Sequence, residues 1–330
     1  MPRTAVVALG GNAFTRAGQA GTHAELRANA LAMADGVLGL RRRGWHVVVV
    51  HGNGPQVGNL AIQQDEGREL VPAQPLFSLG AMTQGQLGSL ICLALRARVP
   101  DLAVAAVVTH AVVAPDDPAF AVPTKPIGPF YSRARADQLS AERGWVVAED
   151  AGRGFRRVVP SPHPVDVVET AAIRALAAAG TVVVAGGGGG VPVVAGADGL
   201  RGVEAVIDKD HVAGLLATAL SAQSLVFVTG VGRVLLDFGL PTERAVDEID
   251  VDQAERYHQD GQFPEGSMGP KILAATRFLR AGGEVAVVSR PEFAAEALEP
   301  PVPGSAPGGG GGERGGTRIV PAGQADRVAS

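Results

Sequence analysis

Short runs of Val, Ile, Leu and Ala alternate along the chain with longer stretches whose apolar residues recur at helical spacing. The short runs end in Gly, Pro or polar residues and predict strands, while the longer stretches predict helices between them. Pro164 is well suited to the first turn of one of these helices. The strands are expected at 4–9, 45–50, 103–109, 181–185, 225–229, 284–289 and 317–320, and the helices at 23–43, 78–98, 164–179, 209–222 and 268–281.

This alternation of uniformly apolar strands with helices is typical of an α/β fold, in which a mainly parallel sheet has helices on both faces. Two stretches break the pattern. Residues 115–164 hold eight prolines and several turn signals, which predict a small irregular subdomain inserted into the α/β frame. Residues 299–316 are rich in Pro and Gly and lack apolar anchors, so we expect a mobile loop there. The chain is therefore expected to form one domain over 1–320, followed by a tail at 321–330.

Composition narrows the class of partner. The 330 residues are 46% hydrophobic and carry a net charge of -4, so neither nucleic acid nor an anionic membrane is an expected partner, and a small molecule is favoured. The first residues lack a secretory signal pattern and no apolar run reaches the ~18 residues that span a membrane, so we expect a cytoplasmic protein. The single cysteine, Cys92, excludes an intrachain disulfide framework and is expected to be a small buried helix residue.

Lysine is rare in this chain. Of 29 basic residues only three are lysines, namely Lys125, Lys209 and Lys271. On the surface, Arg and Lys can replace each other at little energetic difference. Lys is preferred where a compact ammonium must enter a tight site, and bound phosphate is a common case. The three lysines are therefore candidate phosphate ligands, and the alternative is that they remain in loops by chance.

Three glycine-rich loops follow predicted strands. Bare backbone amides at a strand end or a helix N-terminus bind anions, so these loops are candidate phosphate sites. A Rossmann dinucleotide site is a poor match, and neither a P-loop NTPase nor a protein kinase fits the motifs present. For the third loop, five consecutive glycines, close approach of the backbone to a ligand is favoured over a plain flexible connection. The loops are Gly10, Gly11 and Asn12, then Gly52, Asn53 and Gly54, and finally residues 186–190.

Asp208 and Asp210 flank Lys209 where a predicted strand, 202–207, gives way to a helix. An aspartate at a helix start can cap the helix, and this is one interpretation of Asp210. The other is that Asp210 holds two lysines in place through charge-assisted hydrogen bonds. Phosphoryl transfer needs cations around the moving group and in-line positioning rather than covalent help. Three lysines, one organising carboxylate, amide-rich loops and a metal ion would meet that need.

Nine motifs follow one another in a characteristic order and spacing. They are GGNA (10–13), HGNGPQVGNL (51–60), MTQG (82–85), PTKPIGPF (123–130), EDAGRG (149–154), VVPSPHP (158–164), GGGGVPV (187–193), GVEAVIDKD (202–210) and GSMGPK (266–271). Together they resemble the carbamate kinase family of the amino-acid-kinase superfamily. The resemblance spans about residues 4–290 and resumes at Gly316 and Thr317.

This resemblance implies a reaction and a fold. The reaction is reversible phosphoryl transfer with Mg²⁺, in which carbamoyl phosphate and ADP give carbamate and ATP, usually in arginine breakdown. The fold is a three-layer αβα sandwich around a central, mainly parallel sheet, typically as a homodimer. A small protruding subdomain of the family corresponds to the insertion at 115–164.

The resemblance also implies roles for individual residues. Lys125 would bind the transferring phosphoryl group, Lys271 would lie opposite it near the nucleotide phosphates, and Asp210 would orient the lysines. Asp208 and Lys209 would lie near the nucleotide phosphates and the Mg²⁺, which those phosphates would mainly hold. Gly10, Gly11, Asn12, Gly52, Asn53 and Gly54 would line the carbamoyl phosphate pocket, and Thr229, Gly230, Val231 and Met268 would border the nucleotide.

Two alternatives stay open. The chain could phosphorylate another carboxylate, as other members of the superfamily do, or it could sense nucleotide or carbamoyl phosphate without turnover. Gly232, which stands where the family usually carries an aspartate, is the most suspicious residue for a sensor. No general base is needed in the ATP-forming direction, so we expect His51 to shape its loop by a hydrogen bond and His163 to be exposed.

Overall fold

An eight-stranded sheet forms the centre of the computed structural model, which describes residues 3–10, 14–16, 18–150, 152–264, 266–299 and 315–325. The strand order is β15-β17-β16-β12-β1-β2-β9-β3, and neighbouring strands are parallel except β16 and β17. The strands are β1 (Thr4–Leu9), β2 (His46–His51), β3 (Val104–Ala106), β9 (Val182–Val184), β12 (Ser224–Val228), β15 (Glu248–Asp250), β16 (Val285–Ser289) and β17 (Thr317–Val320).

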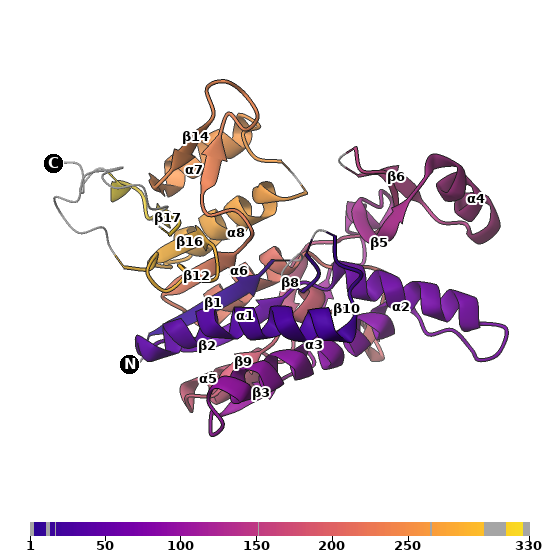
Figure 1. The fold of residues 1–330 in the computed structure, drawn as a ribbon, viewed down its shortest axis with the longest axis horizontal. Helices are drawn as coiled ribbons and strands as arrows, with labels where there is room; N and C mark the ends of the chain where they lie inside the picture. Colours follow the sequence, from indigo (N-terminus) through magenta and orange to yellow (C-terminus); the bar gives the residue numbers. More distant parts are fainter. Residues whose placement is uncertain are drawn as a thin grey trace.

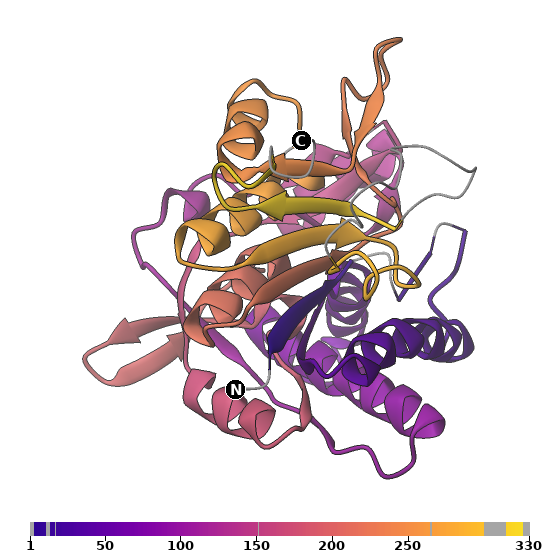
Figure 2. The ribbon, with the colours of Figure 1, turned by 90° about the vertical axis from the view of Figure 1, so that its left-hand side faces the viewer.

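Helices cover both faces of this sheet (Figure 1, Figure 2). Val6 and Ala8 of β1 belong to the core on one face, and Ala5, Val7 and Leu9 belong to the core on the other. Because both faces are buried, the strands are apolar throughout, as in other parallel sheets. The predicted three-layer α/β fold is confirmed. The first face is covered by α5 (Thr170–Ala178), α6 (Lys209–Ala219), α7 (Val251–Gln259) and α8 (Met268–Arg280), and the second by α1 (His23–Arg42) and α3 (Leu76–Arg98).

The helix predicted at 164–179 is wrong in its first part. Residues Pro164–Val167 form β8, which pairs antiparallel with β4 (His110–Val113), and α5 begins only at Thr170. β8 is the edge strand of a second sheet of order β11-β10-β4-β8. A proline is tolerated at the start of an edge strand as well as at the start of a helix, so Pro164 did not distinguish the two.

Two predicted strands are shorter in the structure. β3 spans only Val104–Ala106; the N–H of Val107 still donates to the carbonyl of Val184 in β9, and residues 108 and 109 lie outside the ladder. In the segment predicted as a strand over 202–207, only Gly202 is in a ladder, as the last residue of β11 (Gly199–Gly202), which pairs with β10 (Val191–Gly196). Residues 203–207 run without a ladder, and the backbone N–H of Val206 bonds instead to the carbonyl of Pro160.

A third, small sheet projects from the body (Figure 1). It has the order β5-β7-β6 and, in the part of the chain that the structure describes, carries one α-helix. A separate apolar cluster joins its base to the body, with Ile127 and Val159 from the small sheet packed against Val57, Leu79 and Val206. The domain boundaries predicted from the sequence stay a prediction. The elements are β5 (Lys125–Tyr131), α4 (Arg133–Arg143), β6 (Val147–Glu149) and β7 (Phe155–Val159), preceded by the 3₁₀ turn Pro118–Phe120, and the helix under their base is α2 (Gly54–Gly67).

The sequence predicts no membrane span, yet the helix α3 is long and apolar enough to be a candidate for one. By length and composition alone it could cross a membrane, with a mean hydropathy of 1.2 over its most apolar window. Its apolar residues, among them Leu87 and Leu95, pack against α1 and the sheet, and Cys92 is half-buried in the same layer. The structure therefore gives this helix a place in the core.

The end of the chain is described only in part. Of the loop predicted at 299–316, residues 300–314 lie outside the described residues, as do 326–330 of the predicted tail. The predicted last strand is confirmed as β17, which adds to the sheet between β15 and β16. Remaining elements are the hairpin strands β13 (Val234–Leu236) and β14 (Arg244–Val246).

Candidate active site

The loops that follow the parallel strands open at one edge of the central sheet. At β1 the order reverses, since β2 lies on one side of it and β12 on the other, and ligands of open α/β sheets bind at such a reversal. The backbone N–H of Gly10 donates to the carbonyl of Val228 at 2.8 Å, and that of Gly52 to Leu9 at 3.3 Å. The loops after β1, β2 and β12 are thus adjacent. Gly11 and Asn12 lie outside the described residues.

Asp210 bonds two of the three lysines. Its Oδ1 accepts a hydrogen bond from Lys209 Nζ at 2.6 Å, and its Oδ2 accepts one from Lys271 Nζ at 3.0 Å. Lys271 Nζ also donates to the carbonyl of Ser267 at 3.0 Å. Asp210 is 3% exposed and each of the two lysines 9%. Buried charges persist when they are paired and hydrogen-bonded, and this triad meets that condition.

Asp208 joins the third lysine to the same helix start. Its Oδ1 accepts from the backbone N–H of Asp210 at 2.9 Å, which caps α6, and its Oδ2 accepts from Lys125 Nζ at 2.5 Å. Asp208, rather than Asp210, is therefore the capping residue. Lys125 comes from β5 of the projecting sheet, so one ion pair spans from that sheet to the body.

The charges of this cluster hold the two carboxylates ionised. Burial would raise the pKa of Asp210, but Lys209 and Lys271 together hold it below its ordinary value. Lys125 and Lys209 likewise overcome burial and hold the pKa of Asp208 well below its usual range. Burial lowers the pKa of Lys271, and Asp210 offsets this only in part. Burial also acts on Lys209, but Asp210 and Asp208 outweigh it and raise its pKa. Three ammonium groups against two carboxylates leave a positive excess for an anion.

The loop after β2 is held rigidly from two sides. Asn53 is 4% exposed, and its Nδ2 donates to Thr83 Oγ1 of α3 at 2.8 Å. His51 Nδ1 lies 3.0 Å from the carbonyl of Gly52, so this histidine shapes the loop by the expected hydrogen bond. Burial lowers the pKa of His51 to about 4 and keeps the ring neutral at neutral pH. Thr83 belongs to the MTQG motif, yet the sequence alone gave it no role.

The five-glycine loop is explained by the protein's own packing. A Cβ at Gly187 would lie 2.4 Å from Nε2 of His51, and one at Gly188 would lie 2.1 Å from Nδ2 of Asn53. A Cβ at Gly189 would lie 2.3 Å from the carbonyl oxygen of Ile207. Distances this short exclude any side chain. The glycines let this turn pack directly against His51 and Asn53 at the loop after β2. This close approach is to the protein's own side chains, whereas the sequence favoured a close approach to a ligand.

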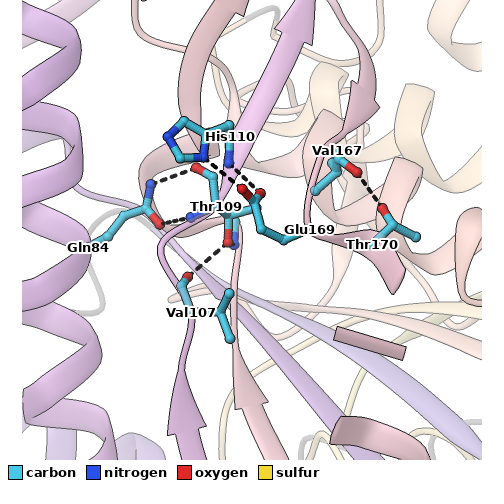
Figure 3. Close-up of polar contacts among 8 residues, drawn as sticks. Gln84, Val107, Thr109, His110, Val167, Glu169 and Thr170 are labelled. Atoms are coloured by element: carbon cyan, nitrogen blue, oxygen red, sulfur yellow. Dashed lines mark hydrogen bonds and ion pairs between the residues drawn. The ribbon is translucent and has the colours of Figure 1, made fainter. Parts of the chain in front are cut away.

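Figure 3 shows a group of hydrogen bonds around Thr109 and His110. The side-chain amide of Gln84 donates to the carbonyl of Thr109 at 3.0 Å and accepts from its N–H at 2.8 Å. Glu169 accepts from the N–H of His110 at 2.8 Å and lies 2.7 Å from its Nδ1. The hydroxyl of Thr109 accepts from the N–H of Gly186 at 3.0 Å. These bonds fix the chain where it passes from β3 to β4, beside the glycine turn.

The predicted nucleotide residues lie at the same edge of the sheet, beside β12 and β16. Thr229 follows β12 and donates its N–H to the carbonyl of Ser289 at the end of β16, at 2.9 Å. Gly230 and Val231 are exposed there. Met268 begins α8, one turn before Lys271. Thr229 thus adjoins the end of β16, and Met268 shares α8 with Lys271.

His163 is half-buried, so the expectation that it is exposed is wrong. Its ring packs edge-on against the ring of His211 at 4.4 Å, and Arg277 bonds to its Nε2. Burial, His211 and Arg277 lower its pKa to about 4. His211 directly follows Asp210, which brings this pair close to the lysine cluster. The sequence alone gave no signal of this contact, because the two histidines lie far apart along the chain.

Among the described residues, no group of three His, Cys, Asp or Glu side chains is placed to hold a metal ion. The two carboxylates of the cluster are already bonded to lysines. Mg²⁺ needs few protein ligands when phosphates and water complete its shell. The described carboxylates therefore fit a Mg²⁺ ion that phosphates would mainly hold.

The sequence and the structure are both similar to those of known proteins. The profile of the amino acid kinase family matches residues 3–289. A carbamate kinase of Pyrococcus horikoshii is 46% identical over 305 residues, which cover 91% of this chain and 97% of that relative. A carbamate kinase of Giardia lamblia bound to citric acid is similar in structure with a TM-score of 0.88 at 34% identity. The same Giardia enzyme bound to AMP-PNP gives 0.85 at 35% identity, and each structure aligns over 97% of this chain and 99% of its own.

Proposed function

The chain belongs to the amino acid kinase family and, within it, to the carbamate kinases, and from this premise we propose that it transfers a phosphoryl group reversibly between carbamoyl phosphate and ADP. The products in this direction are carbamate and ATP. The observation that carries the proposal is the convergence of all three lysines of the chain on two carboxylates at the start of α6.

The chemistry needs positioning and positive charge. A terminal phosphate oxygen of ADP attacks the phosphorus of carbamoyl phosphate, and the bond from phosphorus to the carbamate oxygen breaks. Carbamate leaves with the electron pair. Since the attacking oxygen is already ionised, no protein base has to remove a proton, which agrees with a neutral, buried His51. The lysines stabilise charge on the moving phosphoryl group.

The residues divide this work by position. Lys125 approaches from the projecting sheet, while Lys209 and Lys271 are fixed in the body by Asp210. The loops of Gly10, Gly11 and Asn12 and of Gly52, Asn53 and Gly54 would line the pocket for carbamoyl phosphate, although the N–H groups of Gly10 and Gly52 are themselves bonded to Val228 and Leu9. A substrate this small offers few side-chain contacts, so backbone amides are the natural ligands. Thr229, Gly230, Val231 and Met268 would border ADP, with Asp208 near its phosphates.

Mg²⁺ is part of the proposal. When bound, it would neutralise charge on the nucleotide phosphates. We place it on those phosphates because the described carboxylates of the cluster are engaged by lysines. We extend the proposal to a cytoplasmic homodimer that serves arginine breakdown, as the resemblance implies.

The test is ATP formation by the purified protein from ADP, carbamoyl phosphate and Mg²⁺, with Lys271→Ala as the control. ATP from the wild type and none from the variant is the expected result. Nucleotide binding without ATP formation would identify a sensor. Activity with a larger carboxylate in place of carbamate would identify a different kinase of the family.

A further inference from the structure

Two backbones touch where the projecting sheet meets α2. A Cβ built on Gly58 of α2 would lie 2.0 Å from both the Cα and the N of Gly128 in β5, and 3.1 Å from the carbonyl carbon of Ile127. Carbon atoms attract one another at ~3.5 Å or more, so such a Cβ has no room. The obstacle is main chain on both sides, and no side-chain rotation could relieve it.

Each of the two touching elements begins beside a residue of the proposed site. α2 begins at Gly54, directly after Asn53, and Asn53 is fixed to the body through Thr83 and the glycine turn. β5 begins with Lys125, three residues before Gly128. Since β5 packs on α2 through this contact, the position of α2 determines how closely Lys125 can approach the loop after β2 and Asp208.

We propose that Gly58 is a positioning residue, whose missing side chain lets β5 lie against α2 so that the ammonium group of Lys125 reaches the phosphoryl pocket. This inference rests on the proposed function and adds to it a residue that contacts no substrate. Gly128 is the partner in the contact, and its φ of +74° suits glycine at the point where the two backbones meet.

A side chain at position 58 would change the geometry in a defined direction. β5 must move away from α2 by about 1 to 1.5 Å to restore carbon contact distances. The bond between Lys125 Nζ and Asp208 Oδ2 is 2.5 Å long and would be broken by a displacement of this size. Misplacement of a catalytic group by about 1 Å can lower a rate by ~100-fold. The triad of Lys209, Asp210 and Lys271 belongs to the body and would stay in place.

The first experiment compares Gly58→Ala with Gly67→Ala in the same helix, where a Cβ meets no atom of the described residues within 4 Å. For Gly58→Ala we expect kcat/KM for carbamoyl phosphate to fall about tenfold or more, with the KM for ADP unchanged. Gly67→Ala should match the wild type. Should Gly58→Ala fail to fold, Gly128→Ala is the second variant, because its Cβ has room and only its positive φ forces β5 to adjust.

The second experiment separates positioning from a general structural role. Gly58→Ala is combined with Lys125→Met, and each variant is compared with its parent. If Gly58 acts through Lys125, the alanine causes no further loss once the ammonium group is gone. Losses that multiply in the double variant, or an unchanged rate in Gly58→Ala, would overturn the inference.

A third measurement does not depend on activity. The coupling between Lys125 and Asp208 in unfolding free energy comes from Lys125→Met, Asp208→Asn and the double variant. In the Gly58→Ala background we expect this coupling to disappear, and an unchanged coupling would contradict the inference. If the wild type makes no ATP but the coupling disappears, the proposed function fails while the contact geometry stands.

Discussion

The body and the projecting sheet are stabilised by different kinds of contact. In the body, strands such as β1, β2 and β12 are buried on both faces among aliphatic side chains. In the projecting sheet, arginines stack on aromatic rings. Arg133 lies 5.1 Å from the ring of Phe155, and Arg153 and Arg156 lie 4.7 and 5.2 Å from that of Phe130. Among the described residues, the apolar contact of this sheet with the body is one small cluster at its base.

This difference divides the proposed site into a rigid part and an adjustable part. Lys209 and Lys271 are buried with Asp210 in the body, whereas the side chain of Lys125 is 30% exposed and comes from the projecting sheet. Local opening takes less free energy where few apolar contacts are buried. We therefore expect changes in the body to affect both chemistry and stability, and changes in the projecting sheet to cost little stability, whether or not they affect chemistry.

The largest effect is expected from Lys271→Arg in the body. A planar guanidinium cannot replace an ammonium held between Asp210 and the carbonyl of Ser267, so ATP formation should fall about 1000-fold. Initial rates measure this, and circular dichroism checks the fold. Arg280→Lys, an exposed change on the same helix, should stay within about twofold. A fully active Lys271→Arg would show that the buried triad does not carry the chemistry.

The second-largest effect is expected in how the free energy of unfolding depends on pH, through His51 in the body. The pKa of His51 is about 4 in the folded protein and 6.5 as its ordinary value. Between pH 6.5 and pH 4, His51 binds a proton in the unfolded chain but not in the folded protein. The contribution of neutral His51 to stability is therefore complete above pH 6.5 and is lost as the pH falls toward 4. Denaturant unfolding at pH 7 and pH 4 should show that the wild type loses about 3 kcal/mol more than His51→Gln. Equal losses in both proteins would place the acid sensitivity elsewhere.

The third effect should separate the two regions most clearly. Lys125→Met removes the cation that the projecting sheet supplies, and kcat/KM for carbamoyl phosphate should fall about 100-fold. Because the ion pair with Asp208 is partly exposed, the free energy of unfolding should change by no more than about 1 kcal/mol. Kinetics and denaturant unfolding of the same preparation give both numbers. A large loss of stability would mean that Lys125 holds the two regions together.

The smallest effect is expected from Phe130→Ala in the projecting sheet. It removes the ring under Arg153 and Arg156, which is 41% exposed, so the loss should be about 1 kcal/mol or less. Hydrogen exchange of the amides of β5 and β7 would detect it, and the rate of ATP formation should not change. A loss of activity would show that the aromatic pairs also position Lys125.

Sequence patterns predicted the parts of this fold that are locally determined. The runs at 4–9 and 225–229 are almost wholly apolar and predict buried strands, which the structure has at Thr4–Leu9 and Ser224–Val228. Pro164 begins an edge strand instead of a helix, because its partner β4 lies more than fifty residues earlier in the chain. The composition also singled out the three lysines. The interpretation that Asp210 holds two lysines agrees with its bonds to Lys209 and Lys271. The pairing of Lys125 with Asp208 could not be predicted, since they meet across 83 residues, and the contact of Gly58 with Gly128 depends on how β5 packs.

The convergence of every lysine on one site has a practical meaning for protein chemistry. Ion pairs on the described surface, such as those of Arg98 and Arg133, use arginine. An amine-directed reagent therefore meets no lysine side chain outside the cluster of Lys125, Lys209 and Lys271. Lysine acylation followed by mass spectrometry would report occupancy of this site with no background from other lysines, and the more exposed Lys125 should be labelled first.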